Sequence, residues 1–339
     1  MPDLREKIET YLSKRLQGKV QILDMKLLSG GACQENHLVK LEVSGGPEAG
    51  SYDLVMRTDR GGSLLSSLSR MNEFRIAGAA FDAGVRTPRV FWPEENADAI
   101  GAPFYFMQRI NGNAAGRFIV KDRSIAEARK KLHDELAASL ARLHSIKQSE
   151  KSLDLDFLPR RDARTLALEA VREIRDELSQ FDEAHPAIEL ALNWLDANAP
   201  EADDVVLIHG DFRTGNFLVS PEGLQGVVDW EFAHWGDRHE DISWLCMRDW
   251  RFGVVKKEVG GFADRAPFYE AYERHSGVKV DVRRVLFWEV MGNVRWAVGS
   301  IQQAERHLSG KDRGIEFASI GRRTGEMEFE MMRLIEHAG

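Results

Sequence analysis

Cysteine and long apolar runs are scarce in this sequence. Only two cysteines occur among 339 residues, Cys33 and Cys246, and neither has the nearby Cys or His that a zinc site uses. A disulfide framework is therefore not expected, which favours a reducing compartment such as the cytoplasm. No apolar run approaches a membrane span, and the charged first 16 residues lack the apolar centre of a signal peptide. We expect a soluble, cytoplasmic protein with no membrane partner.

Positive charge is also in deficit, because 46 Lys and Arg face 54 Asp and Glu, a net charge of -8. A general nucleic-acid-binding protein needs a basic face that displaces counterions from phosphates, so no nucleic-acid partner is expected. With 43% hydrophobic residues, the chain is long enough for two ordinary cores. We expect two lobes, and a homodimer remains one option for the assembly.

The N-terminal third has the pattern of a small sheet with helices. Apolar and polar residues alternate around glycine breaks in residues 20–59, which indicates strands, whereas residues 63–83 show helical spacing. The expected elements are a helix at 3–16, three antiparallel strands within 20–59, a helix at 63–83, and strands at 90–92 and 103–110.

A polar segment, NGNAAG at 111–116, has the composition of a hinge between lobes. We place the boundary there, which gives an N-terminal nucleotide-binding lobe of 1–110 and a C-terminal catalytic and acceptor-binding lobe of 111–339. The second lobe is mainly helical. Its expected elements are helices at 124–145, 162–181, 186–198 and 285–306, and strands at 205–208, 217–219 and 224–228.

The segment 205–231, VVLIHGDFRTGNFLVSPEGLQGVVDWE, carries the main functional signal. Its polar residues lie beside short apolar runs expected to be strands, so their directions should be fixed. Phosphoryl transfer needs positioning, metal ions, a cation and a carboxylate that accepts the acceptor's proton. Asp211 is the candidate base, and Arg213 is the candidate cation for the transferred phosphate. Asn216 and Asp229 offer oxygen ligands for Mg²⁺.

Residues 209–216, HGDFRTGN, resemble the HGDxxxxN loop of the aminoglycoside phosphotransferase and choline kinase superfamily. Residues 229–244, DWEFAHWGDRHEDISW, most resemble the kinase-like domain fused to some acyl-CoA dehydrogenases. The resemblance covers about residues 20–335. It implies an α+β, bilobal protein-kinase-like fold, with an N-lobe of antiparallel sheet plus helix and a larger, mainly helical C-lobe. It also implies Mg²⁺-dependent transfer of the γ-phosphate of ATP or GTP to a small-molecule hydroxyl.

The same resemblance assigns residues to the nucleotide. Ser29, Gly30 and Gly31 match a hairpin that covers the phosphates, although paired glycines are also common in plain turns. Arg57 stands where the family usually has a lysine on the third strand, and Glu73 is its expected ion-pair partner.

The segment 104–112 resembles the family's hinge, where backbone groups hold the adenine. The Gln108 carbonyl and the Ile110 amide are expected to face the base, with Met107 behind it.

The interval after the metal aspartate is short, because only seven residues separate Asp229 from Asp237. A long activation segment does not fit there, so we expect a constitutively formed site for a small molecule. Asp237 and Asp241 are expected to cap or anchor the next helix. Glu231 is a candidate second-layer residue near the metal, and His209 is expected to hold the loop by hydrogen bonds.

The acceptor is less well determined by the sequence. Arginines at 248, 251 and 295 favour a neutral or anionic hydroxyl compound over a polycationic sugar. The resemblance makes a hydroxy acid or hydroxyacyl compound the first candidate, while aminoglycosides, amino alcohols such as choline, and hexosamines remain open.

Two other classes of function also remain open. The first is a nucleotide-binding pseudokinase that senses a metabolite or scaffolds a partner, because Arg57 is irregular. The second is a dinuclear metal hydrolase with His209, Asp211, Asp229 and His234 as ligands, which leaves the nucleotide-binding features without a role.

Overall fold

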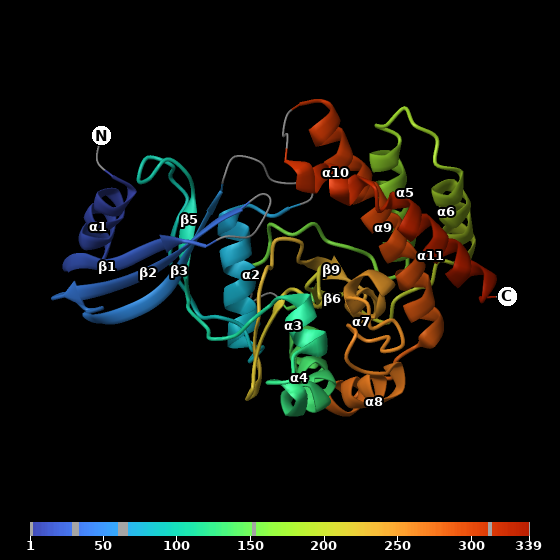
Figure 1. The fold of residues 1–339 in the computed structure, drawn as a ribbon, viewed down its shortest axis with the longest axis horizontal. Coiled ribbons are helices and arrows are strands. Elements are labelled where there is room, and N and C mark those ends of the chain that lie inside the picture. The colour runs from blue at the N-terminus through green and yellow to red at the C-terminus, as the bar shows by residue number, and fades with distance from the viewer. Residues whose placement is uncertain (1–2, 29–33, 60–66, 151–153, 311–313, 339) are drawn as a thin grey trace.

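The computed structural model describes residues 3–28, 34–59, 67–150, 154–310 and 314–338. A small sheet lobe and a larger helical lobe lie side by side, with the two chain ends at opposite extremes of the molecule (Figure 1). The α+β, bilobal architecture expected from the sequence is confirmed.

The N-terminal lobe is built on one antiparallel sheet in the order β1-β2-β3-β5-β4. On the sheet face opposite to Arg57, Ile8 and Leu12 of the first helix share an apolar core with sheet residues such as Phe106. This burial fixes the sheet against the helix. The elements are α1 Leu4–Arg15, β1 Lys19–Leu27, β2 Gln34–Ser44, β3 Gly50–Asp59, β4 Val90–Glu94 and β5 Phe104–Gln108.

Helix α2, Arg70–Asp82, connects the two lobes. It begins later than the sequence suggested, since Ser69 accepts a hydrogen bond from the Asn72 N–H and caps it at 3.3 Å. The earlier part of the predicted helix, 63–66, lies outside the described residues. The buried side chains of Ile76 and Ala80 belong to the core of the helical lobe. The lobe boundary at 110/111 therefore remains a prediction, because α2 contributes to the second core.

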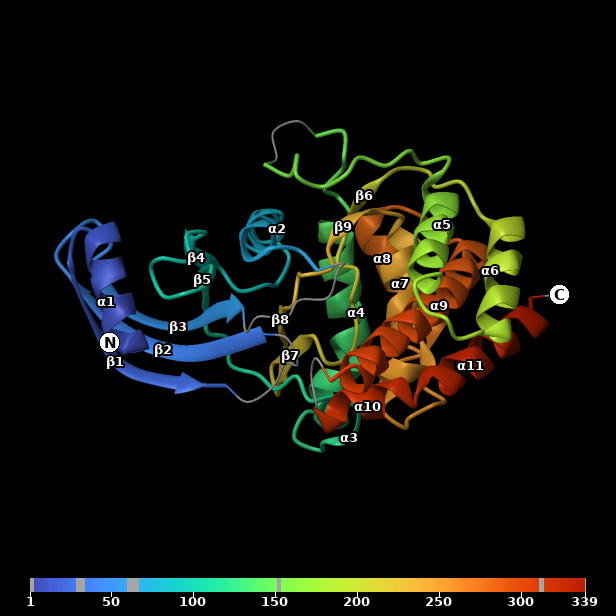
Figure 2. The same cartoon turned by 90° about the horizontal axis from the view of Figure 1, so that it is seen from above.

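The C-terminal lobe packs its helices around α9, which contacts α5, α6, α7, α10 and α11. Two short antiparallel strand pairs, β6 with β9 and β7 with β8, lie between α9 and the N-terminal lobe (Figures 1 and 2). Strand β9 was not expected from the sequence. The elements are α3 Gly116–Lys121, α4 Ala126–Leu143, α5 Leu166–Leu178, α6 Pro186–Asn198, β6 Val206–Ile208, β7 Phe217–Ser220, β8 Gly223–Val227, β9 His234–Gly236, α7 Arg238–Cys246, the 3-10 helix η1 Arg248–Arg251, α8 Arg265–Ser276, α9 Val282–Leu308, α10 Ile315–Gly321 and α11 Thr324–Glu336.

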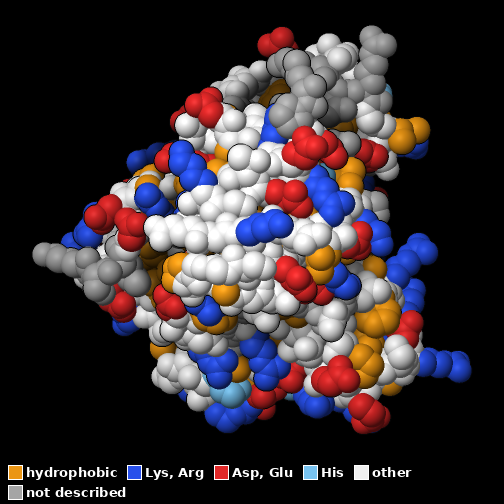
Figure 3. Space-filling view, turned by 90° about the vertical axis from the view of Figure 1, so that its left-hand side faces the viewer, with side chains coloured by type: hydrophobic (Ala, Val, Ile, Leu, Met, Phe, Trp, Pro, Cys, Tyr) orange, Lys and Arg blue, Asp and Glu red, His pale blue; other side chains and the backbone are white. Residues whose placement is uncertain are grey.

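The surface carries mixed charge. On the face shown in Figure 3, acidic and basic side chains alternate without a broad area of one sign. Among the described residues, every helix is too short or too polar to cross a bilayer.

Candidate active site

The loop after β6 makes a tight turn at Gly210. Its φ is +75°, and a Cβ there would lie 2.2 Å from the carbonyl oxygen of Phe232. Glycine is therefore required on both conformational and steric grounds. The carboxylate of Asp241 accepts the backbone N–H groups of His209 at 2.7 Å and Gly210 at 3.0 Å. This aspartate, fully buried in α7, fixes the path of the chain into Asp211.

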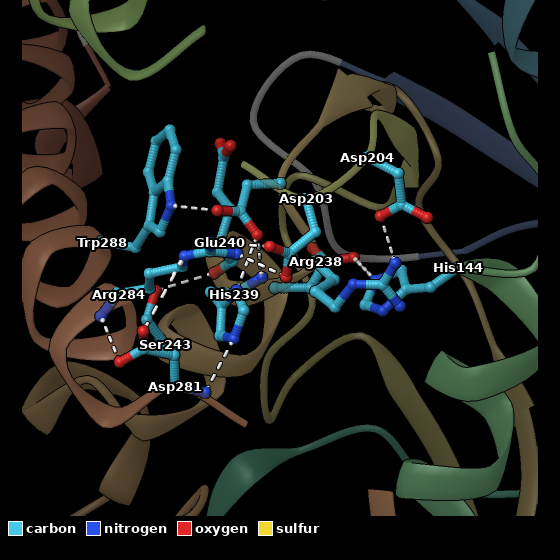
Figure 4. Close-up of polar contacts among 12 residues, drawn as sticks. His144, Asp203, Asp204, Arg238, His239, Glu240, Ser243, Asp281, Arg284 and Trp288 are labelled. Atoms are coloured by element: carbon cyan, nitrogen blue, oxygen red, sulfur yellow. Dashed lines mark hydrogen bonds and ion pairs between the residues drawn. The ribbon is translucent and has the colours of Figure 1, made fainter. Parts of the chain in front are cut away.

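A row of buried, hydrogen-bonded side chains holds Asp241 in place. His144 lies 3.2 Å from it through Nε2 and 2.8 Å from the Tyr272 hydroxyl through Nδ1. Burial lowers the pKa of His144, so the ring is neutral and can donate to Asp241 while accepting from the tyrosine. Arg238 contacts the Tyr272 hydroxyl. It also binds Asp204, as Figure 4 shows, so the row of polar contacts continues toward the surface.

The expected capping role is found for Asp237. Its side chain accepts from the His239 N–H at 3.0 Å, at the first residue before α7, and from the Trp288 indole at 3.2 Å. Asp241 differs from the expectation, because it lies inside α7 and holds the preceding loop. The structure thus divides helix capping and loop anchoring between the two aspartates.

The carboxylate of Asp211 is almost enclosed by donors. Arg213 Nε lies 2.8 Å from Oδ1 and 3.1 Å from Oδ2, and the Trp244 indole N–H donates to Oδ1 at 2.8 Å. Asn216 Nδ2 donates to Oδ2 at 2.7 Å. The contact with Trp244 was missed by sequence reasoning, because a tryptophan on an apolar helix pattern gives no sign of its partner.

Asn216 is oriented by two donations from one nitrogen. Its Nδ2 binds the Asp211 carbonyl at 3.0 Å as well as the carboxylate. With the nitrogen engaged, its Oδ1 is the atom left to meet a cation. The Val228 N–H binds the Asn216 carbonyl at 3.0 Å, and the Val228 carbonyl lies 3.1 Å from His209 Nε2. These bonds hold the loop of Asp211 beside the residue that precedes Asp229.

Asp229 has an unusual backbone. Its φ is +74°, in the left-handed region that non-glycine residues seldom adopt and that is enriched at functional sites. Its Oδ1 lies 2.5 Å from Nη2 of Arg57. Burial opposes ionisation of the carboxyl most strongly, but the charge and hydrogen bond of Arg57, together with the charge of Arg213, outweigh it and lower the pKa of Asp229. The carboxylate is therefore anionic and suited to a hard cation.

Arg57 also reaches the helix that bridges the lobes. Its Nε lies 3.0 Å from Oε2 of Glu73, and its Nη2 lies 2.8 Å from Oε1. Burial disfavours the cation, but Glu73 and Asp229 raise the pKa of Arg57 above its usual value. The predicted pair Arg57–Glu73 is therefore present, and it is joined to Asp229.

Two more residues strengthen this junction. Arg70, the first residue of α2, also binds Glu73 and lies 3.4 Å from Glu231. Burial and the neighbouring charge of Asp229 raise the pKa of Glu231 to about 7. The Leu68 N–H donates to the Glu231 carbonyl at 2.7 Å, so the chain just before α2 is tied to the segment 229–231. Arg70 could have been found from its i,i+3 spacing to Glu73.

The hinge residues lie near this segment. Met107 and Gln108 end β5, and Gln108 donates its N–H to the Arg89 carbonyl at 2.7 Å. Ile110 follows, and its Cδ1 would lie 3.0 Å from a Cβ placed on Gly226 of β8. The hinge thus rests on the hairpin that leads to Asp229. Predicted residues Ser29, Gly30 and Gly31 lie outside the described residues.

The donor set fits magnesium. Asn216 and Asp229 supply one amide oxygen and one carboxylate, and Mg²⁺ is commonly held by one or two such groups together with substrate phosphates. Among the described residues, no three His, Cys, Asp or Glu side chains are grouped for a metal. The ring of His209 is engaged with Val228, and His234 pairs with Glu240 at 3.3 Å. The dinuclear hydrolase is therefore not supported.

This fold and site define a bilobal, kinase-like phosphotransferase. The chain belongs to the family described as "Phosphotransferase enzyme family", whose profile matches residues 24–285. It is 29% identical over 259 residues to acyl-CoA dehydrogenase family member 10 of Mus musculus, covering 72% of this chain and 22% of that protein. Family member 11 of the same organism is 30% identical over 257 residues, covering 72% of this chain and 31% of that protein. The chain thus spans less than a third of the length of either relative.

Solved structures agree on the fold. The choline kinase LicA from Streptococcus pneumoniae superposes with a TM-score of 0.60 at 17% identity, covering 96% of this chain and 98% of that chain. Aminoglycoside phosphotransferase APH(4)-Ia, in a complex with AMP-PNP and hygromycin B, gives a TM-score of 0.58 at 16% identity, covering 97% and 98%. At these identities the likeness shows the fold alone.

Proposed function

We propose that this family member uses Mg²⁺ and transfers the γ-phosphate of ATP or GTP to a hydroxyl group of a small molecule. The observation that carries the proposal is the contact between Arg57 and Asp229, which are 172 positions apart and lie on different lobes. It brings the candidate phosphate-binding cation and the candidate metal ligand into direct contact.

Each side chain then has a separate task. Asn216 and Asp229 hold the magnesium, which neutralises charge on the phosphates when bound. Arg57 binds the α- and β-phosphates, and its position is fixed by Glu73. Asp211 orients the acceptor hydroxyl and takes its proton, because its carboxylate is held at the end of a fixed loop.

Arg213 is proposed to meet the transferred phosphate. In the structure it is paired with Asp211, so this task requires the guanidinium to turn away from that carboxylate. An exchange of one anion for another is favourable when the incoming phosphate is more highly charged. The paired arrangement keeps the cation at the site before the donor arrives.

The donor is proposed as ATP or GTP. The fold accommodates both kinds of purine, since APH(4)-Ia holds AMP-PNP and APH(2")-IIIa holds GDP with kanamycin. The proposed contacts of the base are with the backbone at Gln108 and Ile110, and such contacts depend little on side-chain identity.

The acceptor is proposed as a hydroxy acid or hydroxyacyl compound, with aminoglycosides and amino alcohols as alternatives. The relatives named acyl-CoA dehydrogenases support the first choice. Two of the arginines that favoured an anionic acceptor are already held by groups of the protein. Arg295 pairs with Glu240, and Arg251 donates to the Cys246 carbonyl at 2.7 Å, so both have structural partners.

A substrate screen tests the proposal. Purified protein with Mg-ATP or Mg-GTP is offered hydroxy acids, amino alcohols and aminosugars, and nucleoside diphosphate release is followed. At least one compound should stimulate release, and Asp211→Ala and Asp229→Ala should abolish it. Asp203→Ala is the matched control, because it removes an exposed aspartate of the same lobe that pairs with Arg284. Tight Mg-ATP binding without release for any compound would favour the pseudokinase.

A further inference from the structure

The donors around Asp211 differ in charge and in mobility. Arg213 is a cation on a flexible side chain that is 26% exposed. Trp244 is a neutral donor that is buried in α7, and its indole nitrogen lies 2.8 Å from Oδ1. A neutral donor fixes the direction of a carboxylate without cancelling its charge, so the group can still accept a proton.

Helix α7 holds the same loop at two points. Asp241 binds the backbone N–H groups that precede Asp211, and Trp244, three residues later on the same helix face, binds the side chain. Every residue of α7 is buried, and Asp237 caps its first turn. The helix can therefore act as one rigid support for both the backbone and the carboxylate.

Arg213, the charged donor to Asp211, rests on a tryptophan that in turn packs against Trp244. The Arg213 guanidinium lies over the Trp250 ring at 4.5 Å, and that ring packs against Trp244 with centroids 5.8 Å apart. A cation over an aromatic face is stabilised even when its ion pair is broken. Arg213 can thus leave Asp211 while the tryptophan beneath it keeps the side chain near the site.

We infer that Trp244 is a positioning residue that holds the Asp211 carboxylate for the acceptor hydroxyl once Arg213 turns to the phosphate. This inference rests on the proposed function. Removing the donor should lower kcat about 10- to 100-fold, the effect typical of lost supporting hydrogen bonds. The KM for Mg-ATP should stay within about twofold of the wild type, because Trp244 contacts neither Arg57 nor Asp229 in the described structure.

The kinetic test compares two matched variants. Trp244→Phe removes the indole N–H but keeps an aromatic ring, and its kcat and KM are measured with Mg-ATP and the acceptor found by the screen. Trp92→Phe is the control, since it removes the indole–carboxylate bond of a similarly buried tryptophan, to Glu48 in the N-terminal lobe, without touching Asp211 or α7. The control should keep its kcat within about threefold, the scatter expected for a change outside the site.

A spectroscopic test needs no acceptor and no folded Trp244 variant. The protein contains eight tryptophans, so a ¹⁵N-labelled sample gives up to eight indole N–H resonances. Indoles bonded to carboxylates, such as those of Trp244 and Trp288, should lie downfield, and the Trp244 resonance should move upfield in Asp211→Asn, where its acceptor has lost the charge.

The outcomes separate the two claims. A lower kcat in Trp244→Phe alone, together with the moving indole resonance, supports the inference. An active wild type whose Trp244→Phe variant keeps its kcat within twofold overturns the inference and leaves the proposed function intact, and so does an indole spectrum unchanged in Asp211→Asn. A wild type that transfers phosphate to no compound contradicts the proposed function.

Discussion

Nη2 of Arg57 lies 2.5 Å from Oδ1 of Asp229, while the same guanidinium binds both oxygens of Glu73. One side chain therefore joins the sheet, the bridging helix α2 and the segment that carries Asp229. A planar fork can span two carboxylates in this way, whereas a lysine ammonium is a compact point charge with a different reach.

Replacing Arg57 by lysine should weaken nucleotide binding. The charge is retained but the fork is lost, so we expect about a tenfold rise in the Kd for Mg-ADP, equivalent to roughly 1.4 kcal/mol. Isothermal titration calorimetry measures this directly. Arg175→Lys is the control, because that arginine also spans two carboxylates, Glu189 and Asp196, but lies outside the proposed site. Equal affinities of wild type and Arg57→Lys would show that the fork is not needed.

Gly210 and Gly277 offer a matched pair of substitutions. Both have φ near +75°, but a Cβ at Gly277 meets nothing within 4 Å, while one at Gly210 would collide with the Phe232 carbonyl. Alanine at Gly277 should cost about 1 kcal/mol of unfolding free energy from backbone strain alone. Alanine at Gly210 should cost at least about 3 kcal/mol, since backbone must also move. Similar urea midpoints for both variants would contradict the tight turn.

Arg70 should matter more for stability than a surface arginine on the same helix. Arg70→Met leaves the buried carboxylate of Glu73 with one partner fewer, and breaking a buried ion pair costs about 3 kcal/mol or more. Arg75→Met removes an exposed pair with Asp154 and should change stability by about 0.5 kcal/mol or less. Urea unfolding of both variants measures the difference. A loss at Arg70 no larger than that at Arg75 would refute its role in tying α2 to the segment 229–231.

These examples show what the sequence could and could not predict. Asp211, Asn216 and Asp229 could be placed together because short apolar strands flank them. The fold class and the family followed from those motifs and are confirmed. The partners of Arg70 and Trp244 could not be predicted, since Glu231 lies 161 positions from Arg70 and Asp211 lies 33 from Trp244. Periodicity shows which face is buried but not which distant group it meets.

Some helix and strand boundaries were predicted wrongly for a related reason. Apolar spacing placed the start of α2 too early, and only the cap at Ser69 marks the first helical residue. Strand β9 has three residues, His234–Gly236, too few to show alternation. Its existence depends on pairing with β6, which is a tertiary contact.

Acid should destabilise the protein partly through Glu240. Burial alone would raise the pKa of this carboxyl, but Arg295 on α9 and His234 on β9 outweigh it and lower the pKa to about 2. The folded-state pKa thus lies below the ordinary value, so the stabilisation is complete above about pH 4.5 and is lost as the pH falls toward 2. Between these values the unfolding free energy should fall by up to about 1.4 kcal/mol per pH unit from this group.

Glu240→Gln should remove that part of the slope. Denaturant unfolding between pH 5 and 3 compares the two proteins, and the variant should show the shallower dependence. An identical slope in both would mean that Glu240 does not titrate below its ordinary range.

The most direct test of the account follows the phosphate itself. Wild-type protein with Mg²⁺ and γ-³²P-labelled ATP or GTP is incubated with each compound of the screen, and the acceptor is separated and counted. The account predicts label on an acceptor hydroxyl for the wild type, and none above background for Asp211→Ala or Asp229→Ala under the same conditions. Label that appears equally with Asp229→Ala, or on no compound with either nucleotide for the wild type, would contradict it.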